Sequence, residues 1–305
     1  MKYWFLILAL AAGPAVQSAT FELPTGEFDL VGYQLEIEAE FEDTLLDIAR
    51  HHGIGQEEIV NANPDVDRWL PGAGTQVTIP SRYILPDAPR RGLVLNLPEM
   101  RIYYFPEPEQ GEPAQVQTYP VSIGRMDWNT PLGETRITEK RKDPPWYPPQ
   151  SVREEHEREG DPLPRVVPPG PDNPLGRHAM RLALPSYLIH GTNKTFGVGM
   201  RVSHGCIRML PEDIEYLFTQ VPVGTPVQII NQPVKAGWYG GELYVEVHPP
   251  LEEYDMDMAE LDEELTRVLD DVLAKRFTQL DESAVADVLA RRSGLPEVVS
   301  LTEGW

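Results

Sequence analysis

The only cysteine of the chain, Cys206, lies in a short stretch whose residue types can perform nucleophilic chemistry. It belongs to a Ser-His-Gly-Cys sequence, with His190 upstream and Arg208 two positions further on. A thiolate can attack a carbonyl carbon, an imidazole can take the thiol proton, and backbone N–H groups beside a glycine can stabilise the oxyanion that forms. A lone cysteine is usually a buried structural residue, but these neighbours favour a catalytic nucleophile at Cys206.

The residues around Cys206 also occur in a distinctive order. His-Gly-Thr at 190–192 is followed, after a Gly-rich gap, by Ser-His-Gly-Cys-Ile-Arg at 203–208, and Thr-Pro-Leu-Gly stands at 130–133. This order resembles the motif of the L,D-transpeptidases, the YkuD-type enzymes of the ErfK/YbiS kind that remodel peptidoglycan. The resemblance implies that Cys206 is the acylated nucleophile and that His190 is its base.

Further site residues follow from the resemblance and from the residues nearby. The resemblance implies that the backbone carbonyl of Gly191 orients the His190 imidazole, and that neighbouring residues shape the oxyanion site and hold substrate. The candidates for the oxyanion site are His204 and Gly205. The candidates for substrate binding are Arg208, Ser203, Arg181 and Trp146.

We expect neighbouring positive charge to lower the pKa of the Cys206 thiol, so that it forms a thiolate–imidazolium pair with His190. By the resemblance, the thiolate attacks the bond between diaminopimelate and the terminal D-Ala of a peptidoglycan tetrapeptide stem. D-Ala leaves, and the thioester passes to an amine acceptor, which forms a cross-link or attaches an outer-membrane lipoprotein through its lysine. This chemistry requires no cofactor and no metal.

Three other interpretations of the chain remain open. Water can replace the amine acceptor, which would make the protein an L,D-carboxypeptidase or amidase acting on the same substrate. His190, His204 and Cys206 have a spacing compatible with a metal site. A protein that only binds the cell wall, without catalysis, would need its glycan-binding module but not Cys206.

The first residues have the features of an export signal, predicted over residues 1–19. Lys2 precedes an apolar run that is too short to span a bilayer comfortably, and small residues follow at Ser18 and Ala19. Cleavage after either residue would leave a periplasmic protein with no stable membrane span. In that oxidising compartment a single thiol cannot form an internal disulfide, which again favours chemistry at Cys206.

Charge is distributed unevenly along a chain whose net charge is −22. Residues 22–80 hold 13 acidic and 2 basic residues, and residues 251–305 hold 15 acidic and 5 basic residues. Residues 81–250 are nearly balanced, and several arginines and a lysine lie near Cys206. An acidic protein of this kind disfavours nucleic-acid binding, whereas a locally basic site suits a substrate rich in carboxylates.

Residues 30–80 are predicted to form a small strand-helix-helix-strand module. Its strands are expected at 32–39 and 77–80, with a first helix capped by Asp43 and a second helix over 56–62. This pattern resembles a LysM domain. The resemblance implies binding of peptidoglycan glycan strands that contain N-acetylglucosamine.

Residues 91–231 are predicted to form the catalytic domain, which is mainly β and sandwich-like, with mixed sheets and few helices. Short strand patterns dominate it, and one helix is expected from Pro211. A Pro-rich insert over 140–178 interrupts the series of strands. It is either a lid over the substrate groove, with Trp146 and Tyr147 as candidate walls, or a structural flap that packs these aromatic residues against the sheet. Residues 232–250 are expected to close the series of strands.

The last part of the chain, residues 251–305, has apolar residues at helical spacing on an acidic background. Two amphipathic helices are predicted there, the second beginning at Asp281 and ending near Gly294. We expect this acidic extension to fold back on the catalytic domain or to contact a partner. Its acidic polar face disfavours a role at a membrane surface.

Overall fold

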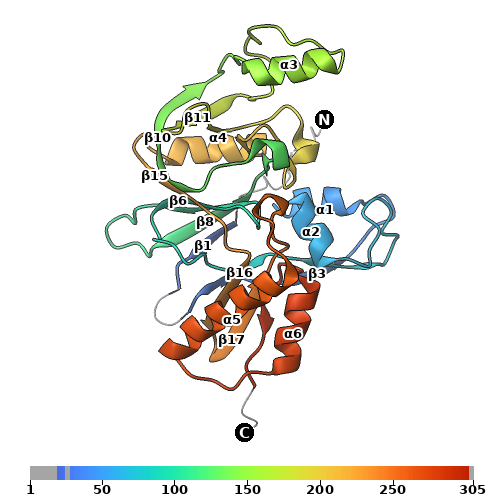
Figure 1. Cartoon of the computed structure of the whole chain (residues 1–305), viewed down its shortest axis with the longest axis vertical. Helices are drawn as coiled ribbons and strands as arrows, with labels where there is room; N and C mark the ends of the chain where they lie inside the picture. Colours follow the sequence, from blue (N-terminus) through green and yellow to red (C-terminus); the bar gives the residue numbers. More distant parts are fainter. Residues whose placement is uncertain (1–18, 25–27, 302–305) are drawn as a thin grey trace, which may run out of the picture.

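The computed structural model describes residues 19–24 and 28–301 (Figure 1). The predicted signal peptide lies outside the described residues except for Ala19, which is the first residue of strand β1 (Ala19–Glu22). Within the described ranges, no helix combines the length and the apolar character that crossing a membrane requires.

The central element is a nine-stranded mixed sheet with the order β1-β8-β7-β6-β15-β10-β11-β12-β14, which confirms the predicted mainly β fold. The pairs β6–β15 and β12–β14 are parallel and the other pairs are antiparallel. The remaining strands of this sheet are β6 (Gly92–Asn96), β7 (Arg101–Phe105), β8 (Gln115–Pro120), β10 (Gly133–Lys142), β11 (His178–Leu182), β12 (Leu188–His190), β14 (Ile207–Arg208) and β15 (Pro226–Ile230).

This sheet curls around one hydrophobic core, because residues from both of its halves pack together. Leu93 of β6 and Ile102 of β7 face the core, while Val94 points to the opposite face of the sheet. The other half adds Ile189 and Ile207 to the same core. Helix α4 (Pro211–Gln220) covers the core with its apolar face and begins at the predicted proline.

The predicted module over 30–80 has the expected strand-helix-helix-strand order. It consists of β3 (Leu35–Glu38), α1 (Leu45–His51), α2 (Gln56–Ala62) and β4 (Gln76–Ile79). Strands β3 and β4 pair antiparallel, and both helices pack over a shared core. The predicted cap at Asp43 is wrong: the Thr44 hydroxyl accepts the N–H of Asp47 and caps α1.

The strand predicted over 32–39 is shorter in the structure, where only residues 35–38 form it as β3. Gly32 instead ends a separate strand, β2 (Leu30–Gly32), which pairs with β5 (Arg82–Ile84). Gly32 has a φ of 77°, and a Cβ at this position would lie 2.0 Å from the carbonyl oxygen of Ser81. The chain can therefore turn at this point only with glycine.

The Pro-rich insert connects β10 to β11 and carries helix α3 (Gln150–Arg158) at one end of the molecule (Figure 1). Asn173 is buried and donates to the carbonyl of Pro144, which ties the two ends of the insert together. Val152 is the only buried residue of α3. This helix is therefore held to the rest of the molecule mainly through polar contacts.

Residues 232–250 do not close the catalytic sheet, contrary to our expectation. They form the hairpin β16 (Val234–Tyr239) and β17 (Glu242–Val247), which pairs with β18 (Glu297–Val298) in a separate sheet. The two predicted helices, α5 (Met258–Lys275) and α6 (Glu282–Arg291), pack against this sheet. Asp281, where the second helix was expected to begin, is the N-cap of α6. The hairpin and the acidic extension thus form one small α/β unit.

A buried group of charged side chains, here called the ion cluster, connects this C-terminal unit to the catalytic domain. The Lys235 ammonium contacts the carboxylate of Glu99, in the β6–β7 turn, and lies 2.8 Å from Oε1 of Glu246. The Nε2 atom of His248 lies 2.6 Å from the same Glu246 oxygen. Lys235 also donates to the carbonyl of Ile84 in β5. The cluster therefore joins β5, the catalytic sheet and the C-terminal hairpin.

Candidate active site

The parallel pair β12–β14 brings the two halves of the motif together. Ile189 lies opposite Ile207, and His190 lies opposite Arg208. Because both isoleucines point into the core and side chains alternate along a strand, His190, Arg208 and Cys206 share the other face of the sheet. Cys206 lies two positions before Arg208, the register partner of His190. In a regular sheet this offset places the Cα atoms of Cys206 and His190 about 8 Å apart. The thiol and the imidazole therefore belong to diagonal neighbours.

The His190 ring is buried, and its orientation is determined by a backbone contact. Its Nδ1 atom lies 2.6 Å from the carbonyl oxygen of Gly191. A carbonyl can only accept, so Nδ1 carries the proton and Nε2 is left as the basic nitrogen. Burial and the nearby Arg208 guanidinium lower the pKa of His190 to about 3. The imidazole is thus neutral near pH 7 and can accept a proton.

Burial also favours the neutral form of the Cys206 thiol. Burial raises its pKa, an effect that the backbone of Leu188 and the charge of Arg208 only partly oppose. The thiol donates to the carbonyl of Ser186, with 3.6 Å between Sγ and the oxygen. The predicted lowered pKa and resting thiolate–imidazolium pair are therefore wrong for the free protein.

The turn that carries Cys206 depends on its glycine. Gly205 has a φ of 93°, and a Cβ there would lie 3.0 Å from the ring of Tyr187. The Thr130 hydroxyl donates to the Gly205 carbonyl at 3.0 Å, so the Thr-Pro-Leu-Gly segment directly supports this turn. Ser203 is fully buried and its hydroxyl donates to the Cys206 carbonyl. Ser203 thus shapes the turn and is not exposed to substrate, contrary to our expectation.

A second short sheet places another basic residue beside the turn. Strands β9 (Ile123–Gly124) and β13 (Arg201–Ser203) pair in parallel, with Gly124 opposite Ser203. Arg125 follows β9 directly, and its N–H donates to the Ser203 carbonyl at 3.1 Å. The next residues form the short 3-10 helix η1 (Met126–Trp128). Sequence reasoning did not single out Arg125, whose only signal is its position just after a predicted strand.

His204 is held between an aromatic ring and a carboxylate. Its ring meets that of Trp128 edge to face, with 5.2 Å between centroids. Its Nε2 atom lies 2.9 Å from Oε2 of Glu155, and the other oxygen of Glu155 contacts the Arg125 guanidinium. Glu155 belongs to α3, so this side chain connects the insert to the Cys206 turn. The hydrogen bond with Arg125 lowers the pKa of Glu155, which keeps it ionised.

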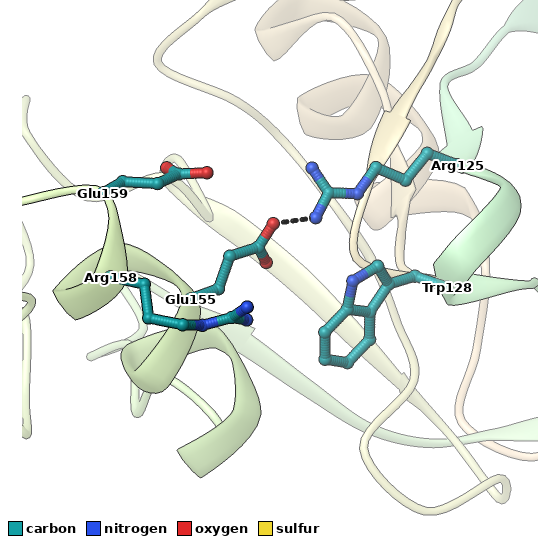
Figure 2. A pocket seen from close by; sticks show the side chains of 5 residues that line it. All are labelled: Arg125, Trp128, Glu155, Arg158 and Glu159. Carbon is teal, nitrogen blue, oxygen red and sulfur yellow. Dashed lines mark hydrogen bonds and ion pairs between the residues drawn. The ribbon is translucent and has the colours of Figure 1, made fainter.

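A cavity of about 410 Å³ opens beside this contact (Figure 2). Figure 2 shows the Glu155 carboxylate pointing toward the Arg125 guanidinium, with the Trp128 indole below it and two residues of the insert on the far side. The lining residues are Arg125, Trp128, Glu155, Arg158 and Glu159. The predicted lid therefore forms one wall of a hollow next to the Cys206 turn.

Two predicted substrate-binding residues lie outside this cavity. Arg181 is opposite Leu188 on the neighbouring strand, and its exposed side chain pairs with Glu139 at 3.3 Å. Trp146 forms a backbone bridge with Val167 within the insert and is only half-buried there. The aromatic residue that does line the cavity is Trp128, which the sequence analysis did not consider.

The small module docks on the Gly-rich gap between the two halves of the motif. The N–H groups at the start of α2 donate to the carbonyls of Val198 and Gly199, at 3.4 and 3.1 Å. A Cβ on Gly199 would lie 2.4 Å from the Cα of Gly55, so this approach requires glycine. A buried ion pair also fixes the module to the catalytic sheet: Nη2 of Arg101 in β7 lies 2.6 Å from Oε2 of Glu58 in α2. The loop that leads to Cys206 is therefore braced by the module.

The metal site considered from the sequence is not supported by the geometry. His190 is engaged by the Gly191 carbonyl and His204 by Glu155. In the described part of the chain, one group of three side chains has the arrangement of metal ligands. This group is Glu99, Glu246 and His248 of the ion cluster. There the Lys235 ammonium already supplies the cation.

The chain is similar to known proteins along nearly all of its length. A family model described as the L,D-transpeptidase catalytic domain, YkuD, matches residues 90–229. The Escherichia coli (strain K12) protein named "Probable L,D-transpeptidase YcfS" is 40% identical over 305 residues, which cover 96% of this chain and 93% of that protein. The protein of the same strain named "Probable L,D-transpeptidase YbiS" is 39% identical, over 92% of this chain and 91% of its own.

A solved structure of the catalytic domain of an E. faecium L,D-transpeptidase is similar over 48% of this chain and 100% of that chain, with 21% identity and a TM-score of 0.35. The sequence relatives show the family, because about 40% identity extends over more than nine tenths of both chains. The chain belongs to the L,D-transpeptidase family, with a YkuD-type catalytic domain, and is an L,D-transpeptidase.

Proposed function

We propose that the protein transfers peptidoglycan stem peptides through a thioester on Cys206, with His190 as the proton acceptor and donor. The observation that carries this proposal is the register of β12 and β14. That register gives His190 and Cys206 a common face, while the Gly191 carbonyl holds the proton on Nδ1 and so makes Nε2 the nitrogen that can accept a proton.

The reaction begins from the neutral pair. His190 Nε2 takes the proton of Cys206 as the sulfur bonds to the carbonyl carbon of diaminopimelate in the tetrapeptide stem. Backbone N–H groups at the Gly205–Cys206 turn stabilise the oxyanion. The C–N bond to D-Ala then breaks, and His190 returns the proton to the leaving amine. An acceptor amine attacks the thioester, loses its proton to His190 and releases the sulfur.

Further parts of the proposal concern the cell wall. We assign residues 30–80 as a LysM module that binds glycan strands, and the acyl acceptor as a second stem peptide or a lysine of an outer-membrane lipoprotein. An exported protein in the periplasm would meet both. Docking of the module on the Gly-rich gap supports this assignment, because it would hold a glycan strand at a constant position relative to Cys206.

Incubation with purified tetrapeptide muropeptides tests the proposal. We expect release of D-Ala and formation of dimers whose cross-link joins two diaminopimelate residues, detected by mass spectrometry. Tripeptide without dimer would indicate that water is the acceptor and that the protein is a carboxypeptidase. Binding to peptidoglycan with unchanged muropeptides would indicate a wall-binding protein without catalysis.

A further inference from the structure

The contact between the insert and the Cys206 turn resembles the way in which a binding site holds a carboxylate ligand. One carboxylate, that of Glu155, contacts a guanidinium and an imidazole at the same time. Both partners come from the segments that build the turn. Arg125 is joined to Ser203 through its backbone, and His204 precedes Gly205 and Cys206 directly. A carboxylate held here is therefore beside the nucleophile.

Arg125 has donor capacity that Glu155 does not use. Glu155 contacts the guanidinium through Nη2, while the Nε atom is buried and has no hydrogen-bond partner among the described residues. A guanidinium offers parallel N–H groups that suit both oxygens of one carboxylate. Arg125 is thus suited to a carboxylate that replaces Glu155 and contacts both Nε and Nη2.

The element that supplies Glu155 is weakly anchored. Val152 is the only buried residue of α3, and the cavity lies between this helix and η1. Displacement of Glu155 would cost its two polar contacts but would disturb little apolar packing. The insert can therefore release the site without unfolding the core.

From these observations, and resting on the proposed function, we propose that Arg125 and His204 form a binding site for a carboxylate of the acyl donor. Glu155 occupies that site in the free protein, so that the donor enters by displacing the insert. The stem peptide carries free carboxylates on D-Ala and on diaminopimelate, on either side of the bond that breaks. Arg125 is a substrate-binding residue in this account, and Glu155 is a built-in competitor.

Titration calorimetry with Cys206→Ala protein tests the site without requiring turnover. The probes are the free tetrapeptide and two analogues, one with the D-Ala carboxylate and one with the diaminopimelate carboxylate converted to an amide. We expect Arg125→Gln to weaken binding of the free peptide about tenfold, the size of a charge-assisted contact. It should leave one of the two amides unaffected, because that amide has already lost the contact. Arg125→Lys keeps the charge and should recover only part of the affinity.

The Glu155→Gln variant should bind the free peptide several-fold more tightly, because its competing charge is gone. Glu157→Gln is the matched control, since Glu157 is exposed on the same helix and its side chain has no ion pair within the described residues. It should bind like the parent. Weaker binding by Glu155→Gln, or equal losses for the acid and both amides in Arg125→Gln, would overturn the proposal.

Absence of peptide binding in every variant would also overturn the proposed carboxylate site. Failure of the transfer reaction is a separate result. A protein that does not form a thioester, but that shows the expected affinities on Cys206→Ala, would retain the carboxylate site and lose only the proposed function.

Discussion

The active site and the ion cluster are both buried and polar, yet burial has opposite consequences in the two places. At the active site burial drives His190 and Cys206 to their neutral forms, and the nearest charge, Arg208, increases that effect on the imidazole. In the ion cluster burial alone would raise the pKa of Glu246, but Lys235 and His248 lower it below its ordinary value.

The difference lies in how each buried group is partnered. In the ion cluster the Lys235 ammonium contacts the carboxylates of Glu99 and Glu246, so the pKa shifts of Lys235 and Glu246 favour their charged forms, and the contacts connect three parts of the chain. The His190 imidazole is buried and hydrogen-bonds to backbone groups of Gly191 and Leu175, not to a carboxylate, so burial keeps it neutral. The ion cluster therefore holds parts of the fold together, whereas the active site keeps an imidazole and a thiol in forms that can react.

The largest effect is expected when the base is removed from the active site. His190→Ala should lower the rate of Cys206 acylation by about 10²- to 10⁴-fold, the usual contribution of a positioned general base. The rate is measured from the release of D-Ala in samples quenched at successive times. The His178→Ala variant, which removes an imidazole on the neighbouring strand, should remain within a few-fold of the parent. Equal losses in both variants would contradict the role of His190.

The next effect should be on stability and should arise in the ion cluster. Lys235→Met removes the cation between two buried carboxylates and should lower the free energy of unfolding by about 3–5 kcal/mol. Denaturant unfolding followed by circular dichroism measures it. Exposed Arg50, which pairs with Glu212 at 3.5 Å, is the control. Arg50→Ala should cost less than about 1 kcal/mol, and a comparable loss in both variants would refute the contrast.

A smaller effect should appear in the pH dependence of unfolding. The pKa of His190 is about 3 in the folded protein and 6.5 in its ordinary state. Between these values the unfolded chain binds the proton and the folded chain does not, so stability falls as pH falls. From pH 6.5 to 5 this linkage is worth at most about 2 kcal/mol. Unfolding midpoints across this range should be less pH-dependent in His190→Asn than in the parent.

The smallest expected effect concerns the charge next to the site. Arg208→Gln should raise the pKa of His190, because a repelling cation is removed, and should also raise the pKa of Cys206, because a stabilising cation is lost. Iodoacetamide should therefore alkylate Cys206 a few-fold more slowly at pH 8. Faster alkylation in the variant would show that Arg208 does not stabilise the thiolate.

Much of the molecule can be predicted from local sequence. The motif identifies Cys206, His190 and Gly191, and the helices at 56–62 and from Pro211 follow from apolar spacing and from proline. These features depend on residues that are near one another in the chain. The assigned roles of Cys206 and His190 in catalysis remain predictions.

Features that depend on tertiary packing were not predictable in the same way. Burial raises the pKa of Cys206, whereas the neighbouring charges visible in the sequence favoured a lowered one. The contact of Arg125 with Glu155 joins residues 30 positions apart, across an irregular insert. The hairpin over 234–247 pairs with β18, some fifty residues later, and nothing in its own pattern distinguishes that partner from the catalytic sheet.

The most direct test of the account is the intact mass of the protein during reaction with a tetrapeptide donor in the absence of acceptor. We predict an adduct equal to the tripeptide acyl group on Cys206, with one D-Ala released for each adduct. The Cys206→Ala protein should show neither. Release of D-Ala by Cys206→Ala, or unmodified protein with no D-Ala released, would contradict the central claim.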